Sequence, residues 1–239
     1  MWKPIVIELT GLPWSWKTTV LSDIRKQNLL SENFFICDEN SNISKSYNQK
    51  KLLNKMFFRG LNLLKYPSLH YKFVMLSLEN KNKYFACFNK FSLYLYFFDK
   101  IYSSSNYNYI VFDQFLLQYI FRSLSFGSLE EETIVRKISK LKKDFFIYPI
   151  HFDTSIDVHK KRVKERKEKW EKGNPNDINK KKSNDNPDKR YISKHITQKY
   201  CELTNKPYLE VDGDASIEEK TKQVMKHIEY ILEITGNNE

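Results

Sequence analysis

Short apolar runs alternate with longer segments of helical periodicity along this 239-residue chain. The short runs read as strands, because they are rich in branched and aromatic side chains and are bounded by polar residues or proline. They lie at residues 4–9, 33–39, 109–113, 145–152 and 207–212. Continuous apolar strands separated by helices indicate a parallel sheet covered on both faces. The pattern therefore predicts an α/β fold.

Apolar positions recur at helical spacing between these runs. We expect helices at residues 17–28, 116–124, 129–142, 155–169, 188–204 and 216–234, and a purely helical block at about 50–105. Ser216 should cap the last helix, since Glu219 follows three residues later. The length suits one domain. We therefore expect residues 1–239 to form a single domain, a five-stranded, mostly parallel sheet flanked by helices, with the helical block as an insert.

Composition limits the class of protein. Hydrophobic residues make up 41% of the chain, as in folded proteins. The cysteines Cys37, Cys87 and Cys201 are widely spaced, which suggests neither a disulfide framework nor a zinc site. The most apolar window, residues 91–98, is too short to cross a membrane, and no secretory signal precedes the first strand. We expect a cytoplasmic protein without a membrane span.

The formal net charge of +11 is unevenly distributed. Residues 160–172 contain eight Lys or Arg against three Glu. Such a segment suits a mobile cationic lid over phosphates, at about 158–195, but a solvated helix face has the same composition. A nucleic-acid site would interleave aromatic and basic residues, and no such motif is present. Nucleic acid is therefore a weaker expectation than a small anionic substrate.

A phosphate-binding loop follows the first strand, with two bulky residues in it. The loop consists of Gly11, Leu12, Pro13, Trp14, Ser15, Trp16, Lys17, Thr18 and Thr19. A strand before it and a helix after it form the context in which the Walker A motif is meaningful. In that motif backbone N–H groups face the β-phosphate, the lysine neutralises the β- and γ-phosphates, and the next hydroxyl binds Mg²⁺. We therefore predict ATP and Mg²⁺ as ligands, with Lys17 and Thr18 as their main contacts.

Trp16 occupies the position where the chain comes closest to phosphate. Glycine is used there because it lacks a Cβ and tolerates the backbone angles of a concave nest. As written, the loop should bind ATP poorly. Glycine at positions 14 and 16 would restore the full motif.

The chain has four tryptophans. Besides the two in the loop, Trp2 and Trp170 also lie where glycine would be unremarkable. We hypothesise that all four are UGA codons translated as Trp, although the source lineage reads UGA as Gly. The rival explanations are a deliberate double substitution and a decayed pseudoenzyme. The coding DNA decides between them, because UGG at codons 14 and 16 would remove the hypothesis.

Four landmarks occur in order along the chain. They are the loop at 11–19, the strand ending in Asp113, the pattern from Asp153 to Arg166, and the run Tyr208 to Gly213 before the last helix. With these landmarks the chain resembles the P-loop nucleotide and nucleoside kinases, most nearly the thymidylate-kinase-like group, over essentially its whole length. The resemblance implies a three-layer P-loop kinase fold and ATP-dependent phosphoryl transfer to a small-molecule acceptor.

Asp113 could order Mg²⁺, for which Thr18 is the other predicted contact, or orient the acceptor. Parallel α/β sheets bind ligands at the carboxyl ends of their strands, where Asp113 lies. An acid that merely caps the next helix is the alternative. The family has Asp-Arg at this place, whereas Gln114 follows here. This departure puts a nucleoside monophosphate acceptor in doubt.

Arg162 and Arg166 are four residues apart, so they share one helix face and can reach a transferring phosphoryl group. Similar kinases place arginines at the lid base in this way. A general base would come from Asp38, Glu39 or Asp113, since a carboxylate at the end of the second strand faces the acceptor in related kinases. Two adjacent acids at a strand end are equally ordinary as loop residues.

The acceptor itself stays open: a nucleotide, a nucleoside, or a sugar or lipid-linked intermediate. We expect it to bind under the helical insert. If Trp14 and Trp16 are genuine, the alternative is a catalytically inactive P-loop scaffold or partner-binding protein. The sequence does not decide the oligomeric state, and a homodimer remains open.

Overall fold

The computed structural model describes residues 5–12, 15–37, 107–113, 115, 117–118, 147–173 and 188–236, with positions 64 and 71. Apart from those two positions, both helical, the expected insert at 50–105 lies outside the described residues. So does the expected helix at 129–142, and so do residues 174–187 of the proposed lid.

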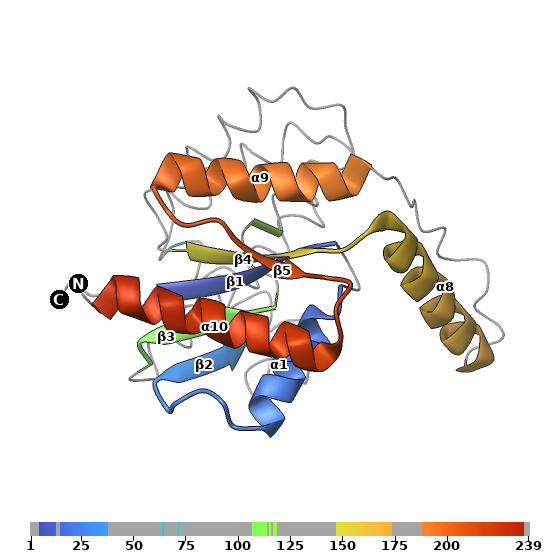
Figure 1. Ribbon diagram of the computed structural model, residues 1–239, viewed down its shortest axis with the longest axis horizontal. Coiled ribbons are helices and arrows are strands. Elements are labelled where there is room, and N and C mark those ends of the chain that lie inside the picture. The colour runs from blue at the N-terminus through green and yellow to red at the C-terminus, as the bar shows by residue number, and fades with distance from the viewer. Residues whose placement is uncertain are drawn as a thin grey trace.

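Five parallel strands form one sheet in the order β2-β3-β1-β4-β5 (Figure 1). The strands are β1 (Ile5–Gly11), β2 (Phe34–Cys37), β3 (Tyr109–Phe112), β4 (Ile147–Asp153) and β5 (Leu209–Asp212). Each corresponds to an apolar run in the sequence, with bounds that differ by at most two residues. The predicted α/β class and five-stranded parallel sheet are confirmed.

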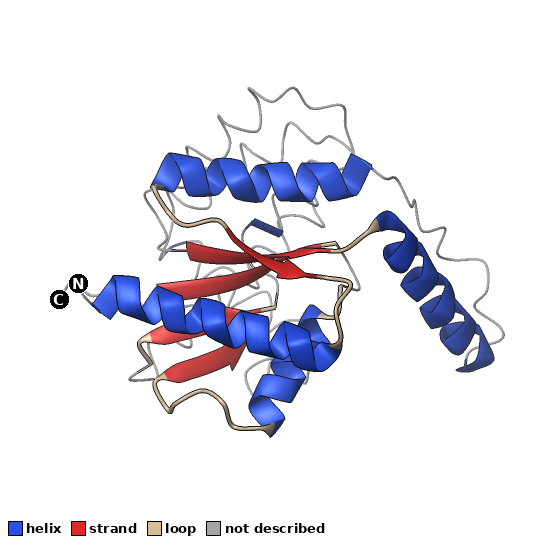
Figure 2. Cartoon of the chain, in the orientation of Figure 1, coloured by secondary structure: helices blue, strands red, loops and turns tan. Residues whose placement is uncertain are grey.

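Helices cover both faces of the sheet (Figure 2). They are α1 (Lys17–Lys26), α8 (Ile156–Gly173), α9 (Asp188–Thr204) and α10 (Ile217–Gly236). α1 and α10 pack on each other and on one face, whereas α9 packs on β1 and β4 from the other side. α8 projects away from the sheet (Figure 1). No helix in the described ranges is long and apolar enough to cross a membrane.

Capping hydroxyls lie at the start of two helices: Ser216 before α10, as the sequence predicts, and Ser155 before α8. The Glu219 N–H donates to Ser216 Oγ at 3.1 Å at the start of α10. The Val158 N–H donates to Ser155 Oγ at 3.4 Å at the start of α8. These bonds satisfy amides that have no partner within the helix.

The two faces of the central strands differ in polarity. Alternation in β1 sends Ile7 and Leu9 to the α1/α10 face, where they join a fully apolar core. It sends Glu8 and Thr10 to the α9 face, and both are buried there. A mainly hydrophobic layer thus lies on one side of the sheet and a hydrogen-bonded polar layer on the other.

β1 is also where the connections change direction. The chain passes from β1 to β2 and β3 on one side, then crosses to β4 and β5 on the other. Ligands of open α/β sheets bind at the carboxyl ends of the strands at such a switch point. The segment of interest, residues 11–19, begins there.

Candidate functional site

The loop after β1 starts with a close approach between two strands. Gly11 has φ +124°, and a Cβ there would lie 2.6 Å from the Phe152 carbonyl oxygen of β4. Only glycine fits a position with both constraints. Farther along, the Ser15 N–H donates to the Leu12 carbonyl at 3.4 Å, which turns the chain back. Pro13 and Trp14 lie outside the described residues.

Lys17 folds its side chain back into this loop. Its Nζ donates to the Leu12 carbonyl at 2.8 Å, to Ser15 Oγ at 2.9 Å and to the Gly11 carbonyl at 3.3 Å. The residue is only 3% exposed. The loop is therefore curved with an ammonium on its inner side, which is the arrangement that binding of an anion requires.

Trp16 has the backbone conformation of a glycine. It is the N-cap residue of α1 with φ 66° and ψ 10°, in the left-handed region. This region costs a residue with a Cβ about 1 kcal/mol or more. Its indole is 40% exposed and makes no capping hydrogen bond within the described part of the chain. The backbone at position 16 thus suits the residue that the complete motif has there.

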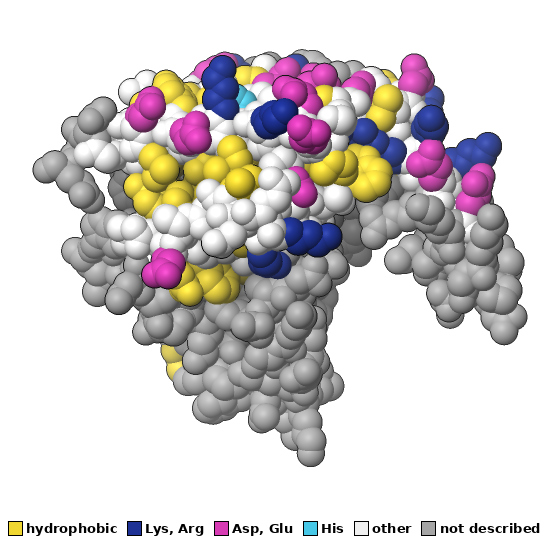
Figure 3. Space-filling view, turned by 60° about the horizontal axis from the view of Figure 1, so that its bottom comes forward, with side chains coloured by type: hydrophobic (Ala, Val, Ile, Leu, Met, Phe, Trp, Pro, Cys, Tyr) yellow, Lys and Arg dark blue, Asp and Glu magenta, His cyan; other side chains and the backbone are white. Residues whose placement is uncertain are grey.

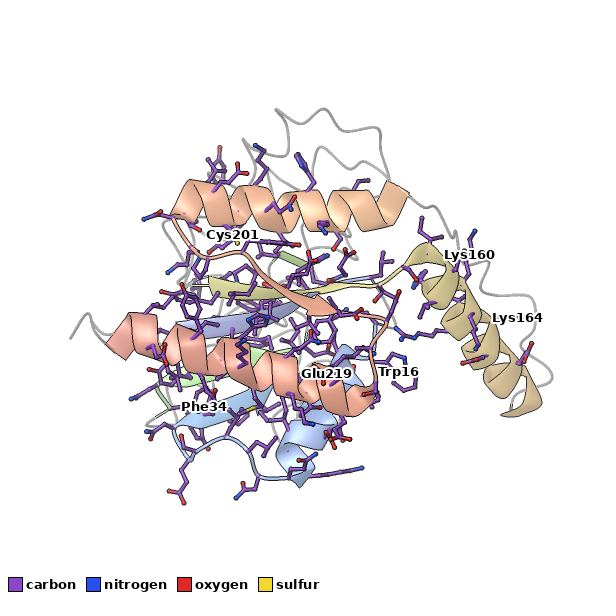
Figure 4. The ribbon with its side chains drawn as sticks, in the orientation of Figure 1. Trp16, Phe34, Lys160, Lys164, Cys201 and Glu219 are labelled. Atoms are coloured by element: carbon purple, nitrogen blue, oxygen red, sulfur yellow. The ribbon has the colours of Figure 1, made fainter. Side chains whose placement is uncertain are left out.

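Arg162 of α8 lies against this indole. The guanidinium carbon is 5.7 Å from the centre of the Trp16 ring, within range of a cation–π contact. In the view of Figure 4, Trp16 is drawn between α8 and the first turn of α10. Nη1 of Arg162 is buried without a hydrogen-bond partner among the described residues. Burial lowers the pKa of Arg162, and the nearby carboxylates Asp214, Glu165 and Asp212 oppose that shift.

Thr18 and Asp113 meet at the carboxyl edge of the sheet. The Thr18 hydroxyl donates to Asp113 Oδ2 at 2.6 Å, which joins α1 to the end of β3. Oδ1 of the same carboxylate is buried and has no hydrogen-bond partner among the described residues. A hydroxyl and a carboxylate oxygen are ligands that suit Mg²⁺, which usually keeps several waters and binds substrate phosphates. No cluster of three or more His, Cys, Asp or Glu that could hold a metal ion occurs in the described ranges.

The remaining predicted site residues make no described contact with the Lys17 and Thr18–Asp113 groups. Thr19 is half-buried in the first turn of α1. Arg166 is one turn beyond Arg162 on α8, as expected, but its side chain is not described. Asp38, Glu39 and Gln114 lie outside the described residues. Their predicted roles stay predictions.

Glu8 is a buried group at this site that sequence reasoning missed. It lies in the middle of β1, fully buried, and its carboxylate accepts three backbone N–H groups of the segment after β3. The signal in the sequence was a single charged residue between Ile7 and Leu9 in an otherwise apolar strand. A charge at such a position is costly unless it is fully hydrogen-bonded.

A buried hydrogen-bonded row lies beside the loop, under α9. The Thr197 hydroxyl donates to the Ser193 carbonyl at 2.9 Å, so Thr10 must donate to Thr197, at 3.3 Å. His151 Nδ1 lies 3.2 Å from Thr10 Oγ1 and is therefore the donor in that bond. Burial lowers the pKa of His151 to about 4; Asp153 and Glu210 oppose this shift, and Lys17 and Lys194 reinforce it. The imidazole is neutral at pH 7.

The loop between β5 and α10 packs against the base of α8. A Cβ at Gly213 would lie 2.1 Å from Thr154 Oγ1. The Lys220 ammonium donates to the Ala215 carbonyl and is buried. Burial lowers the pKa of Lys220 to about 8, the charge of Arg162 acts in the same direction, and Asp212 and Asp214 oppose it. This loop therefore holds charged groups close to Arg162.

No protein-family model matches the chain, and no curated protein matches it. Among solved structures it is similar to a deoxyadenosine kinase from M. mycoides with bound dCTP, with a TM-score of 0.40 and 15% sequence identity. That similarity covers 95% of this chain and 100% of the other. A TM-score this low carries no conclusion about family or activity. The architecture rests on the strand order and pairing of this chain itself.

Proposed function

We propose that this protein, with glycine at positions 14 and 16, is an ATP-dependent kinase of a small-molecule acceptor. The observation that carries the proposal is the curved loop after β1, with the Lys17 ammonium on its inner side and the Thr18–Asp113 pair at its exit. Phosphoryl transfer asks the protein mainly for positioning and charge stabilisation. An inward-facing ammonium and a hydroxyl–carboxylate pair at the start of α1 meet that demand.

Each residue has a defined task in this proposal. Lys17 would exchange its carbonyl partners for β- and γ-phosphate oxygens. Thr18 and Asp113 would hold Mg²⁺, which when bound neutralises charge on the phosphates. Arg162, which contacts Trp16 in the chain as written, would donate to phosphate oxygens once that indole is absent.

The acceptor site is less defined. A base for the acceptor hydroxyl would come from Asp113, Asp38 or Glu39. The absence of an arginine after Asp113 favours a nucleoside, a sugar or a lipid-linked intermediate over a nucleoside monophosphate. A screen of these acceptors with labelled ATP identifies the class.

Nucleotide binding tests the proposal directly. We compare the chain as written with the double-glycine variant, Trp14→Gly with Trp16→Gly, by titration calorimetry with Mg·ATP. The double-glycine variant should bind and the written chain should bind at least about tenfold more weakly, since the indole occupies space beside the phosphates. Lys17→Ala in the double-glycine variant should abolish most of the binding. Failure of the double-glycine variant to bind would refute the proposal.

A second function has one observation in its favour. In the written chain Trp16 and Arg162 contact each other, so the loop is covered by the protein's own side chains. A scaffold or partner-binding protein without catalysis would have such an arrangement. UGG codons at 14 and 16, together with no binding by either form, would favour this function.

A further inference from the structure

The carboxylate of Glu8 links the strand of the phosphate loop to the segment that carries Asp113. Oε1 accepts the N–H groups of Phe115 at 3.0 Å and Gln118 at 2.8 Å, and Oε2 accepts that of Leu117 at 2.9 Å. Glu8 is fully buried. Its partners lie more than a hundred residues later in the chain, so this is a contact of the tertiary structure.

The position of Glu8 explains which segment it holds. β1 and β3 are neighbours, and Glu8 is in register with Phe112, the last residue of β3. The chain leaves β3 at Asp113, and the amides of Phe115, Leu117 and Gln118 lie against the carboxylate of Glu8 in the neighbouring strand β1. Through Asp113, Thr18 holds the start of the turn that follows β3, and Glu8 holds residues 115–118. The turn is thus fixed at two points, at Asp113 itself and at the backbone amides just after it.

Charge makes this attachment rigid. A buried carboxylate is costly unless its oxygens are hydrogen-bonded, and three amide donors meet that need. Residues 117–118 are helical, so these amides lie at a helix start, where negative charge is favourable. A central strand is among the most rigid supports that a site can have. Loss of the carboxylate would leave three amides unpaired and release the turn.

We propose that Glu8 is a positioning residue that sets the location of Asp113 against Thr18 and thereby the affinity for Mg²⁺ with nucleotide. This inference rests on the proposed function. Glu8 acts through Asp113, because its carboxylate binds three backbone amides of the segment that follows Asp113. The competing interpretation is that Glu8 caps a helix and affects only stability.

The test is a double-mutant cycle in the double-glycine variant with Glu8→Gln, Asp113→Asn and both. Glutamine keeps the shape but replaces one acceptor oxygen by a donor. Affinity for ATP is measured with and without Mg²⁺. Glu8→Gln should weaken Mg·ATP binding about tenfold, as loss of supports behind metal ligands does, and metal-free ATP binding by less than about twofold. The double variant should bind Mg·ATP no more weakly than the single variant with the lower affinity, because both substitutions disrupt the same Thr18–Asp113 pair.

A control separates positioning from general destabilisation. Ile228→Val trims the buried core of α10 on the opposite face of the sheet. It should lower the Tm without changing the ratio of affinities with and without Mg²⁺. If Glu8→Gln likewise leaves that ratio unchanged, Glu8 is only a cap and the inference is wrong. Should Glu8→Gln fail to fold, Glu8→Asp, which keeps the charge but shortens the reach, replaces it.

The protein without nucleotide gives an independent readout. In thermal unfolding, the Tm loss of the double variant should be smaller than the sum of the two single losses, and additive losses would overturn the inference. Amide exchange at Asp113 and at residues 115–118 should speed up together in Glu8→Gln. If the double-glycine variant binds no ATP, the proposed function fails, whereas this cycle still decides whether Glu8 positions Asp113.

Discussion

At the scale of single residues, Gly11 and Trp16 share a backbone requirement, a positive φ, at the two ends of the loop. Both have positive φ, and both lie where the chain changes from strand to loop or from loop to helix. Gly11 meets the requirement without cost, because it has no Cβ to press on the Phe152 carbonyl. Trp16 meets it at a cost, which its contact with Arg162 offsets in part.

Replacement of Trp16 separates these contributions. Trp16→Gly relieves the left-handed strain and loses the ring, whereas Trp16→Ala keeps the strain and loses the same ring. We expect the glycine variant to be more stable than the alanine variant by about 1 kcal/mol in urea unfolding. Equal stabilities would show that position 16 is not left-handed in solution.

His151 should make stability depend on pH. Its pKa falls from 6.5 to about 4 on folding, so the unfolded chain binds more protons between these values. Stability is full above pH 6.5 and decreases as the pH falls towards 4, by about 3 kcal/mol at most. Urea unfolding at several pH values measures this. In His151→Gln the loss of unfolding free energy between pH 6.5 and pH 4 should be smaller by about 3 kcal/mol. If stability depends on pH in this variant as it does in the original chain, His151 is not the source of the pH dependence.

At the scale of elements, the sequence predicted strands and helices better than their ends. β1 runs two residues past the apolar run because Gly11 still pairs with Phe152 of β4. β4 likewise extends to Asp153, which is in register with Asp212 of β5. α8 continues to Gly173, beyond the expected residue 169. The end of a strand depends on pairing with a strand that is distant in the sequence. A local sequence pattern therefore does not predict it.

The close contact between Gly213 and Thr154 fixes the loop before α10 to the end of β4. Gly213→Ala would place a methyl group on Thr154 backbone atoms at 2.8 Å, which forces the loop to move. We expect a loss of about 1–3 kcal/mol in unfolding free energy, as overpacking usually costs.

Gly236→Ala is the matched control for that substitution. Nothing lies within 4 Å of a Cβ built at Gly236, the last residue of α10. Its stability should change by less than about 0.5 kcal/mol. Equal losses in the two variants would mean that the contact with Thr154 does not restrict the loop.

At the scale of the whole molecule, the sequence predicted the sheet and its class but not the strand order. The order β2-β3-β1-β4-β5 places the loop at residues 11–19 at the switch point between two halves of the sheet. Of the predicted site, Lys17, Thr18 and Asp113 lie together, and Arg162 lies beside Trp16. Glu8 was missed because its partners are distant in sequence, and a strand pattern treats one charge as an exception.

The distribution of charged side chains over the surface is a further feature at this scale. Figure 3 shows basic and acidic side chains intermixed over the visible described surface, without a continuous basic face there. On the described part of that face, basic side chains therefore do not form a single patch of the kind that a long polyanion binds.

Nucleotide should stabilise the whole fold if it binds at the loop. Binding to the folded state alone adds about 2.7 kcal/mol at a ligand concentration 100 times the Kd. We expect this gain for the double-glycine variant with Mg·ATP in urea unfolding. Lys17→Ala in the same background should remove it, and a gain that survives this substitution would place the nucleotide elsewhere.

The contrast between the two faces of the sheet has a consequence for how the protein tolerates change. The apolar contacts between α10 and the sheet have no preferred direction. One apolar residue can therefore replace another there with a small loss of stability. α9 is seated through Thr197, and Lys194 bridges Asp153 and Glu210 at 2.9 Å each, so rotation of this helix by one residue would break these bonds together. Evolutionary drift should therefore be faster at the apolar positions of α10 that face the sheet than at Lys194 and Thr197 of α9.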